Sequence, residues 1–135
     1  EKMLNALKRK DLERFVEEYQ RILLELPSYH DLKDENSYHM MMLGMCAFLR
    51  RDYAVKSNRE SGTGRSDICL YSKNGRYPNL VLEFKYTKDE TEDLAELAEK
   101  ALDQIKAKQY DAEMEGEVVY LGLAHRGKSA CVRWE

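Results

Sequence analysis

The sequence lacks the cysteine pairs and long apolar runs that mark several large classes of protein. Its three cysteines, Cys46, Cys69 and Cys131, are widely spaced and include no CxxC pair. A zinc site is therefore not expected, and we interpret all three as reduced core residues of a cytoplasmic protein. No apolar run approaches the roughly 20 residues needed to cross a bilayer, and the charged first residues do not resemble a signal peptide, so we expect no membrane association.

The sequence also lacks the signatures of several common enzyme sites. It has no GxxxxGK[ST] segment to cradle phosphates, and no serine–histidine–acid arrangement stands out. The formal net charge is −3, whereas a dedicated DNA-binding domain is usually basic. This counts against tight autonomous binding of nucleic acid. It does not exclude a nuclease, because acidic metal ligands contribute to the negative total.

What remains is the composition of one soluble globular domain spanning residues 1–135. The chain is 43% hydrophobic and 35% charged, and its 135 residues are enough to bury a core. The first residue is glutamate rather than methionine, so we expect a fragment of a longer protein.

Hydrophobic periodicity predicts an α/β fold in which a central mixed sheet is flanked by helices. Helical spacing extends over 3–26, with a break near Lys10 and Asp11 as the N-cap of a second helix. The helix between the third and fourth strands implies a parallel strand pair. The other predicted elements are helices at 35–51 and 91–112 and strands at 53–58, 67–72, 79–86, 117–124 and 129–134.

Asp67, Glu83 and Lys85 are the strongest candidate site. Asp67 begins one predicted strand and Glu83 lies late in the next, so an antiparallel hairpin brings them side by side. Glu83 and Lys85 are two residues apart and point to the same face of the strand. Paired carboxylates suit Mg²⁺ or Mn²⁺, and a lysine supports an attacking water. The alternative is a surface salt bridge between Glu83 and Lys85, but the apolar run around them indicates a buried strand, where unpaired charge is rare.

The segment ESGTGRSD supplies two further candidates, Glu60 and Arg65. Its glycines allow a tight turn or a close approach of backbone to ligand. Glu60 would add a carboxylate near Asp67, and Arg65 would contact phosphate. The alternative is a hairpin turn with solvated side chains.

Residues on the flanking helices complete the set. Glu35 begins the second helical region, where an acid is also explained by the helix dipole, and His39 follows one turn later on the same face. Gln104 borders the apolar stripe of the long helix and would orient water or contact the backbone of the substrate. Tyr110 is a substrate candidate whose alternative role is core packing, and Lys106 and Lys108 add positive charge nearby. We interpret the methionines at 40–42 and 45 as core residues.

These motifs resemble the PD-(D/E)XK nuclease superfamily, whose restriction-endonuclease-like core has the order αβββαβ. The chain is most similar to the nuclease-like domain at the C-terminus of bacterial AAA-ATPase-like proteins. The resemblance covers roughly residues 4–134 and rests on the segments ENSYH, SNRESGTGRSDI, LVLEFK, ALDQIKAKQYD and VVYLGLAH. One departure is Ser66, which stands where a proline often precedes the first acid.

The resemblance implies a role for each matching position. Asp67 and Glu83 would hold Mg²⁺ or Mn²⁺ with the Phe84 carbonyl, and Lys85 would position the water. Glu35 matches the acid of the first core helix, while Gln104 and Tyr110 match a QxxxxxY pattern. The expected function is a metal-dependent nuclease acting on DNA, next to an upstream AAA-ATPase domain. The alternatives are a catalytically inactive interaction module of the same fold and a homo-oligomerising domain.

Overall fold

A computed structural model describes the chain except for residues 1, 27–31, 33, 61–64 and 109–112. Each predicted element is present, with the first helical region divided in two. The helical elements are α1 (Lys2–Lys8), α2 (Leu12–Glu25), α3 (Glu35–Met45), the 3-10 turn η2 (Cys46–Leu49) and α4 (Leu94–Ala107). The strands are β1 (Tyr53–Glu60), β2 (Arg65–Ser72), β3 (Asn79–Tyr86), β4 (Val118–Arg126) and β5 (Ser129–Trp134).

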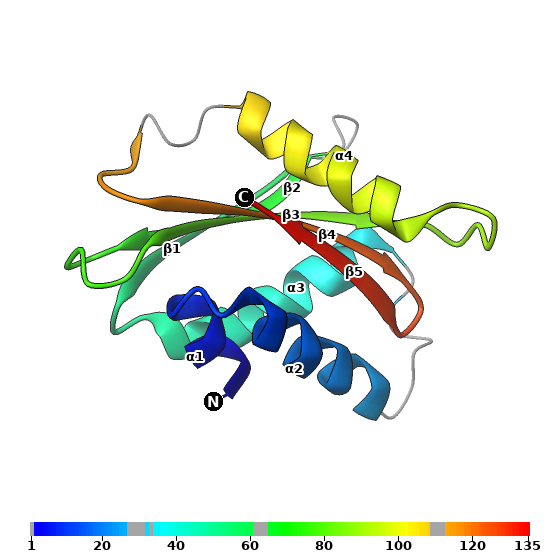
Figure 1. Cartoon of the computed structure of the whole chain (residues 1–135), viewed down its shortest axis with the longest axis horizontal. Coiled ribbons are helices and arrows are strands. Elements are labelled where there is room, and N and C mark those ends of the chain that lie inside the picture. The colour runs from blue at the N-terminus through cyan, green and yellow to red at the C-terminus, as the bar shows by residue number, and fades with distance from the viewer. Residues whose placement is uncertain (1, 27–31, 33, 61–64, 109–112) are drawn as a thin grey trace.

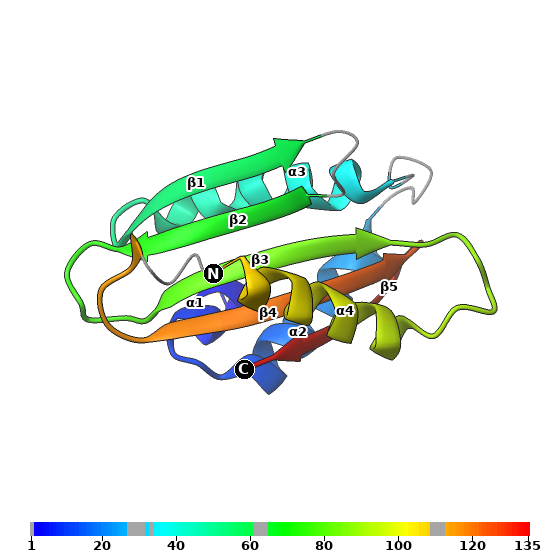
Figure 2. The same ribbon diagram turned by 90° about the horizontal axis from the view of Figure 1, so that it is seen from above.

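The strands form one mixed sheet in the order β1-β2-β3-β4-β5. The β3–β4 pair is parallel and the other three pairs are antiparallel, as the crossover helix α4 requires. Helix α4 covers one face of the sheet, and α1, α2 and α3 cover the other (Figures 1 and 2). The predicted fold class, a central mixed sheet flanked by helices, is confirmed.

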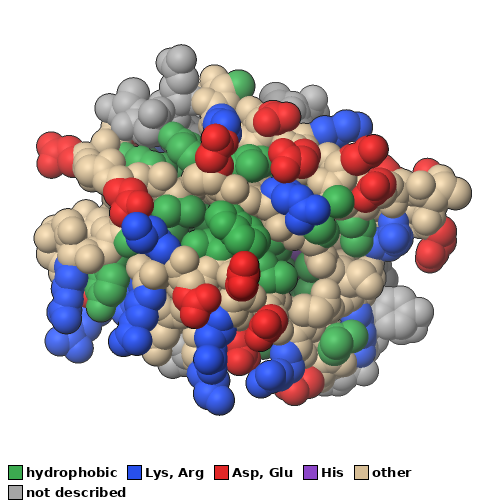
Figure 3. Space-filling model, viewed as in Figure 1, with side chains coloured by type: hydrophobic (Ala, Val, Ile, Leu, Met, Phe, Trp, Pro, Cys, Tyr) green, Lys and Arg blue, Asp and Glu red, His purple; other side chains and the backbone are tan. Residues whose placement is uncertain are grey.

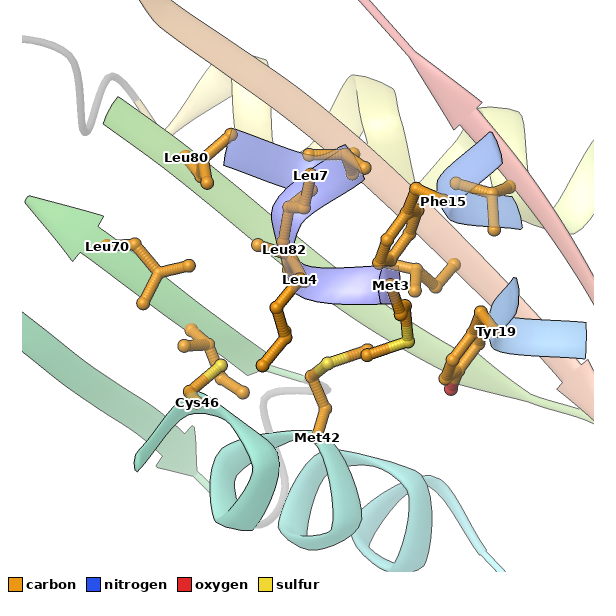
Figure 4. Close-up of a cluster of buried hydrophobic side chains, with 14 of the residues drawn as sticks. Met3, Leu4, Leu7, Phe15, Tyr19, Met42, Cys46, Leu70, Leu80 and Leu82 are labelled. Carbon is orange, nitrogen blue, oxygen red and sulfur yellow. The ribbon is translucent and has the colours of Figure 1, made fainter. Parts of the chain in front are cut away.

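Two apolar clusters hold these layers together. Side chains from α1, α2 and α3 pack with Leu70, Leu80 and Leu82 on one face of the sheet (Figure 4). On the other face, α4 packs against Cys69 and Val81. Alternate residues of β3 thus enter different clusters, so β3 is covered on both sides, as its continuous apolar run predicted.

The predicted break between the first two helices is confirmed at Lys10. Lys10 has a positive φ of 62°, a conformation that ends α1. Asp11 then caps α2, because its carboxylate accepts a hydrogen bond of 3.3 Å from the backbone N–H of Arg14.

Three sequence-based expectations need correction. The helix predicted over 35–51 ends at Met45 and continues only as the η2 turn. Within this segment Met42 is buried, but Met40 is 49% exposed and Phe48 is 79% exposed, so the methionines are only in part core residues. Cys131 is half-buried on β5, near the edge of the sheet.

Helix α4 is shorter than predicted because Asp93, rather than Thr91, precedes its first turn. The Asp93 carboxylate accepts a hydrogen bond of 2.8 Å from the backbone N–H of Ala95, which fixes the start of the helix at Leu94. Among the described residues, no helix combines the length and apolarity that a membrane crossing requires.

Gly122 of β4 lets α4 approach the sheet closely. A Cβ atom at this position would lie 2.3 Å from the backbone oxygen of Ala98 and 2.6 Å from the backbone nitrogen of Leu102. Only glycine fits this spacing. Gly122 is also the cross-strand neighbour of Glu83, so the closest contact between helix and sheet lies beside that carboxylate.

Candidate active site

Asp67 and Glu83 lie directly opposite each other on β2 and β3. They form the last pair of the β2–β3 ladder, beyond which the two strands lie apart (Figure 2). Both side chains are fully buried, and alternation places them on the α4 side, together with Cys69 and Val81. The hairpin thus brings together two carboxylates that are 16 positions apart in sequence, as predicted.

The two oxygens of the Glu83 carboxylate have different surroundings. Oε2 accepts a hydrogen bond of 3.2 Å from the backbone N–H of Ser66. Oε1 is buried and has no hydrogen-bond partner in the described part of the chain, although the ammonium of Lys108 lies 3.6 Å away. Burial raises the pKa of Glu83 to about 7, and the charge of Lys108 opposes this rise. One oxygen is therefore fixed by the backbone while the other retains free lone pairs.

Asp67 is held by a side chain of the neighbouring edge strand. The Asn58 amide nitrogen donates a hydrogen bond of 2.8 Å to Asp67 Oδ1, across the pair in which Asn58 of β1 faces Asp67 of β2. The thiol of Cys69 lies 3.9 Å from the same oxygen. Asn58 therefore orients Asp67 without adding charge. The sequence contained one signal for this contact. In an antiparallel hairpin, residues at equal distances from the turn face each other, so the glycine-rich segment between Glu60 and Arg65 pairs position 58 with position 67.

Lys85 lies two residues after Glu83 on β3, so the two side chains point to the same face of the strand. It is half-buried, and its charge lowers the pKa of both Glu83 and Glu35. Its backbone carbonyl accepts a hydrogen bond of 3.0 Å from Nδ1 of His125. The backbone of Lys85 is thus anchored through a buried residue that the sequence did not indicate.

Glu35 is the first residue of α3 and is half-buried. Burial raises the pKa of this carboxyl, while the charges of Lys85 and Lys108 lower it. Glu35 therefore shares the electrostatic environment of the Glu83 region, although it belongs to the helix layer on the other face. It does not join Asp67 and Glu83 in a cluster: in the described part of the chain, no three His, Cys, Asp or Glu side chains are grouped as metal ligands would be.

His39 connects α3 to the first two strands. Its Nδ1 lies 2.7 Å from the Ser66 hydroxyl and its Nε2 lies 2.7 Å from the Ser57 hydroxyl. The ring is fully buried, and burial lowers its pKa, so the neutral form is favoured. Ser66, which stands in place of the motif proline, therefore bonds to His39 through its side chain and to Glu83 through its N–H.

The remaining candidates are located only in part. Gln104 is half-buried on α4. Glu60 and Arg65 are cross-strand partners at the end of the β1–β2 ladder, but their side chains are not among the described ones. Tyr110 lies outside the described residues. Of the two lysines near the end of α4, Lys108 faces Glu83, whereas Lys106 pairs with Glu135 at the surface.

The donor set fits a small divalent cation. Mg²⁺ is usually held by one or two carboxylates and keeps several waters, so a pair such as Asp67 and Glu83 is sufficient. The buried Glu83 Oε1, which no described residue engages in a hydrogen bond, has the lone pairs that such an ion requires. The Phe84 carbonyl as a metal ligand stays a prediction. The side chain of Phe84 packs on the opposite face, where its ring centroid lies 5.3 Å from that of His39.

A restriction-endonuclease-like sheet with two adjacent acids and a lysine defines the class of metal-dependent nuclease folds. The family model of the PD-(D/E)XK nuclease superfamily matches residues 33–135, and the chain belongs to that superfamily. No curated protein and no solved structure matches the chain significantly.

Proposed function

We propose that this domain hydrolyses phosphodiester bonds in DNA with Mg²⁺ or Mn²⁺ held by Asp67 and Glu83. The observation that supports this most strongly is the pairing of the two buried carboxylates at the end of the β2–β3 ladder. Charged groups are rarely buried side by side unless something opposes their repulsion. A divalent cation would do so.

The chemistry divides among a few side chains. A divalent ion bound here would neutralise charge on the phosphate and lower the pKa of a bound water. Lys85, beside Glu83 on β3, would hold the attacking water and offset developing negative charge. Glu35 would contact the ion through water, and Gln104 would orient the substrate. The Phe84 carbonyl would supply a further oxygen ligand.

Substrate contacts and partners belong to the same proposal. Glu60, Arg65 and Tyr110 would line the approach of the DNA strand. An upstream AAA-ATPase domain in a bacterial cytoplasmic protein would deliver that strand, and self-association of the chain would place two sites together. Size-exclusion chromatography with light scattering would reveal such an oligomer.

A lysine substitution tests the reaction directly. Lys85→Ala should reduce Mn²⁺-dependent cleavage by at least about a hundredfold, because a positioned group at the reacting atoms contributes that much. Lys88→Ala is the matched control, since Lys88 is exposed three residues further on. Both variants should unfold at the temperature of the parent. Cleavage by Lys85→Ala at the parent rate would contradict the assignment.

The substrate class needs a separate assay. Linear duplex, single-stranded and branched DNA should each be compared with RNA of the same sequence, with Mn²⁺ present. Cleavage of RNA alone would retain the reaction but reject DNA as the substrate.

A second candidate is a catalytically inactive module of the same fold that binds nucleic acid or protein. The formal net charge of −3 favours it, as do the acidic and basic side chains interspersed over the face in Figure 3. Thermal unfolding distinguishes the two: the nuclease should gain stability with Mn²⁺ and lose that gain in Asp67→Ala. An inactive module should show no such gain.

A further inference from the structure

Lys108, at the end of α4, has a buried ammonium group beside the carboxylate of Glu83. Its side chain is 26% exposed, yet the Nζ atom is buried and has no hydrogen-bond partner among the residues that the structure describes. Its nearest described ionic partner is Oε1 of Glu83 at 3.6 Å, which is beyond hydrogen-bonding range. Burying an ammonium is costly, and the carboxylate of Glu83 offsets part of that cost.

The contact is with one specific oxygen of Glu83. Oε2 is fixed by the Ser66 N–H, whereas Oε1 faces Lys108. Among the cations that lower the pKa of Glu83, Lys108 has a larger effect than Lys85. Lys108 is thus the principal counter-ion of this carboxylate, and it faces the oxygen that has free lone pairs.

Two cations cannot share that oxygen without strong repulsion. A divalent ion that coordinates Oε1 needs the space and the negative charge on which the ammonium now depends. The lysine stem has four rotatable carbons and starts from the C-cap of α4, so the ammonium can move away without unfolding the helix.

We propose that Lys108 is a resident cation of the site, which competes with the divalent metal for Glu83 Oε1 and so sets the metal affinity of the protein. This inference rests on the proposed function, because it requires that Glu83 bind metal. It adds a residue whose role is distinct from that of Lys85: Lys108 neutralises Glu83 and must be displaced before the metal binds.

Calorimetric titration of the purified chain with Mn²⁺, without nucleic acid, tests the proposal. At an alkaline pH, where Glu83 is ionised in every variant, Lys108→Met should bind Mn²⁺ at least roughly ten times more tightly than the parent, because a unit charge at this range shifts an ionic equilibrium by about one to three powers of ten. Lys108→Arg, which keeps the charge, should bind about as the parent does. Lys106→Met is the matched control, since Lys106 pairs with Glu135 at the surface, and its affinity should be unchanged.

A cleavage assay gives a second measurement. The Mn²⁺ concentration that gives half-maximal cleavage should fall in Lys108→Met by the same factor as the dissociation constant. If Lys108→Met does not fold, Lys108→Gln carries the same expectation with a polar side chain of similar length.

Each outcome separates this inference from the proposed function. If the parent binds and uses Mn²⁺ but the neutral variants bind it no more tightly, Lys108 is only a structural partner of Glu83 and this inference is wrong. If the parent binds no Mn²⁺ at all, both this inference and the proposed metal site are wrong.

Discussion

Nδ1 of His125 lies 3.0 Å from the backbone oxygen of Lys85, so a buried histidine holds the chain at the candidate catalytic lysine. On the other side of the ring, Nε2 lies 2.6 Å from the Tyr19 hydroxyl. The carbonyl accepts from Nδ1–H, which leaves Nε2 to accept from Tyr19. The ring is therefore neutral, and its face stacks on Tyr38 with ring centroids 4.1 Å apart.

This arrangement predicts a loss of stability in acid. Burial lowers the pKa of His125 to about 4, from an ordinary value of 6.5. Between these two values the His125 side chain binds a proton in the unfolded chain but not in the folded one, so its contribution to the free energy of unfolding falls as the pH falls from about 6.5 to about 4. Glu83, whose pKa is raised to about 7, contributes in the opposite direction, so the His125 contribution is obtained by comparison with a variant that lacks it. The contribution is on the order of 3 kcal/mol. Urea denaturation across this range measures it.

His125→Phe is the matching variant, because phenylalanine keeps the stacked ring and does not titrate. It should be less stable than the parent at pH 7, where the Tyr19 hydroxyl and the Lys85 carbonyl lose their partner. The stability difference between the parent and this variant should shrink as the pH falls from about 6.5 to about 4. A constant difference would show that His125 is not the residue that titrates.

The two serines that bond to His39 should differ in their effect on stability. Ser66 is buried, so Ser66→Ala leaves a histidine nitrogen without a partner and should lower the free energy of unfolding by about 1–2 kcal/mol. Ser57 is exposed, and water can replace its hydroxyl, so Ser57→Ala should cost less than about 0.5 kcal/mol. Chemical denaturation compares them. Equal losses would mean that burial does not govern this network.

Gly122 should tolerate no larger side chain. In Gly122→Ala the new Cβ meets backbone atoms of α4, so the helix must move and stability should fall by about 1–3 kcal/mol. Cleavage should fall as well, because α4 carries Gln104, which we propose orients the substrate. The control is Gly44→Ala on α3, where nothing lies within 4 Å of the added methyl. This change should stabilise the helix by up to about 1 kcal/mol.

Two apolar residues of the α3–η2 segment should respond in opposite ways. Met42 is fully buried, so Met42→Ala should cost about 2–5 kcal/mol. Phe48 is largely exposed, so Phe48→Ser should change stability by less than about 0.5 kcal/mol and improve solubility. Thermal unfolding and the solubility limit measure the two effects. A large loss in Phe48→Ser would mean that this ring is covered by another part of the protein.

The sequence predicted the sheet well because its strands have clear signals. The bounds of β3 and β5 agree with the predicted ranges, since apolar runs and turn residues limit both. The pairing of Asp67 with Glu83 followed from the same hairpin. The η2 turn was missed because its apolar residues look buried by composition alone, and only the packed structure shows that Phe48 is largely exposed.

The environment of the site residues was harder to predict. Asn58, Ser66 and His125 act through single hydrogen bonds to neighbours on other strands, and periodicity carries no information about such contacts. Lys108 was recognised only as nearby charge. Its contact with Glu83 depends on how closely α4 approaches the sheet at Gly122, which is a property of the assembled layers.

The order of the strands along the chain also bears on how the domain folds. Asp67 and Glu83 belong to consecutive antiparallel strands, so a short loop closure brings them together. Lys108 lies on the crossover between β3 and its parallel partner β4, so its contact with Glu83 closes a longer loop. The two carboxylates are therefore brought together by a contact of shorter range in sequence than the one that supplies their neighbouring ammonium.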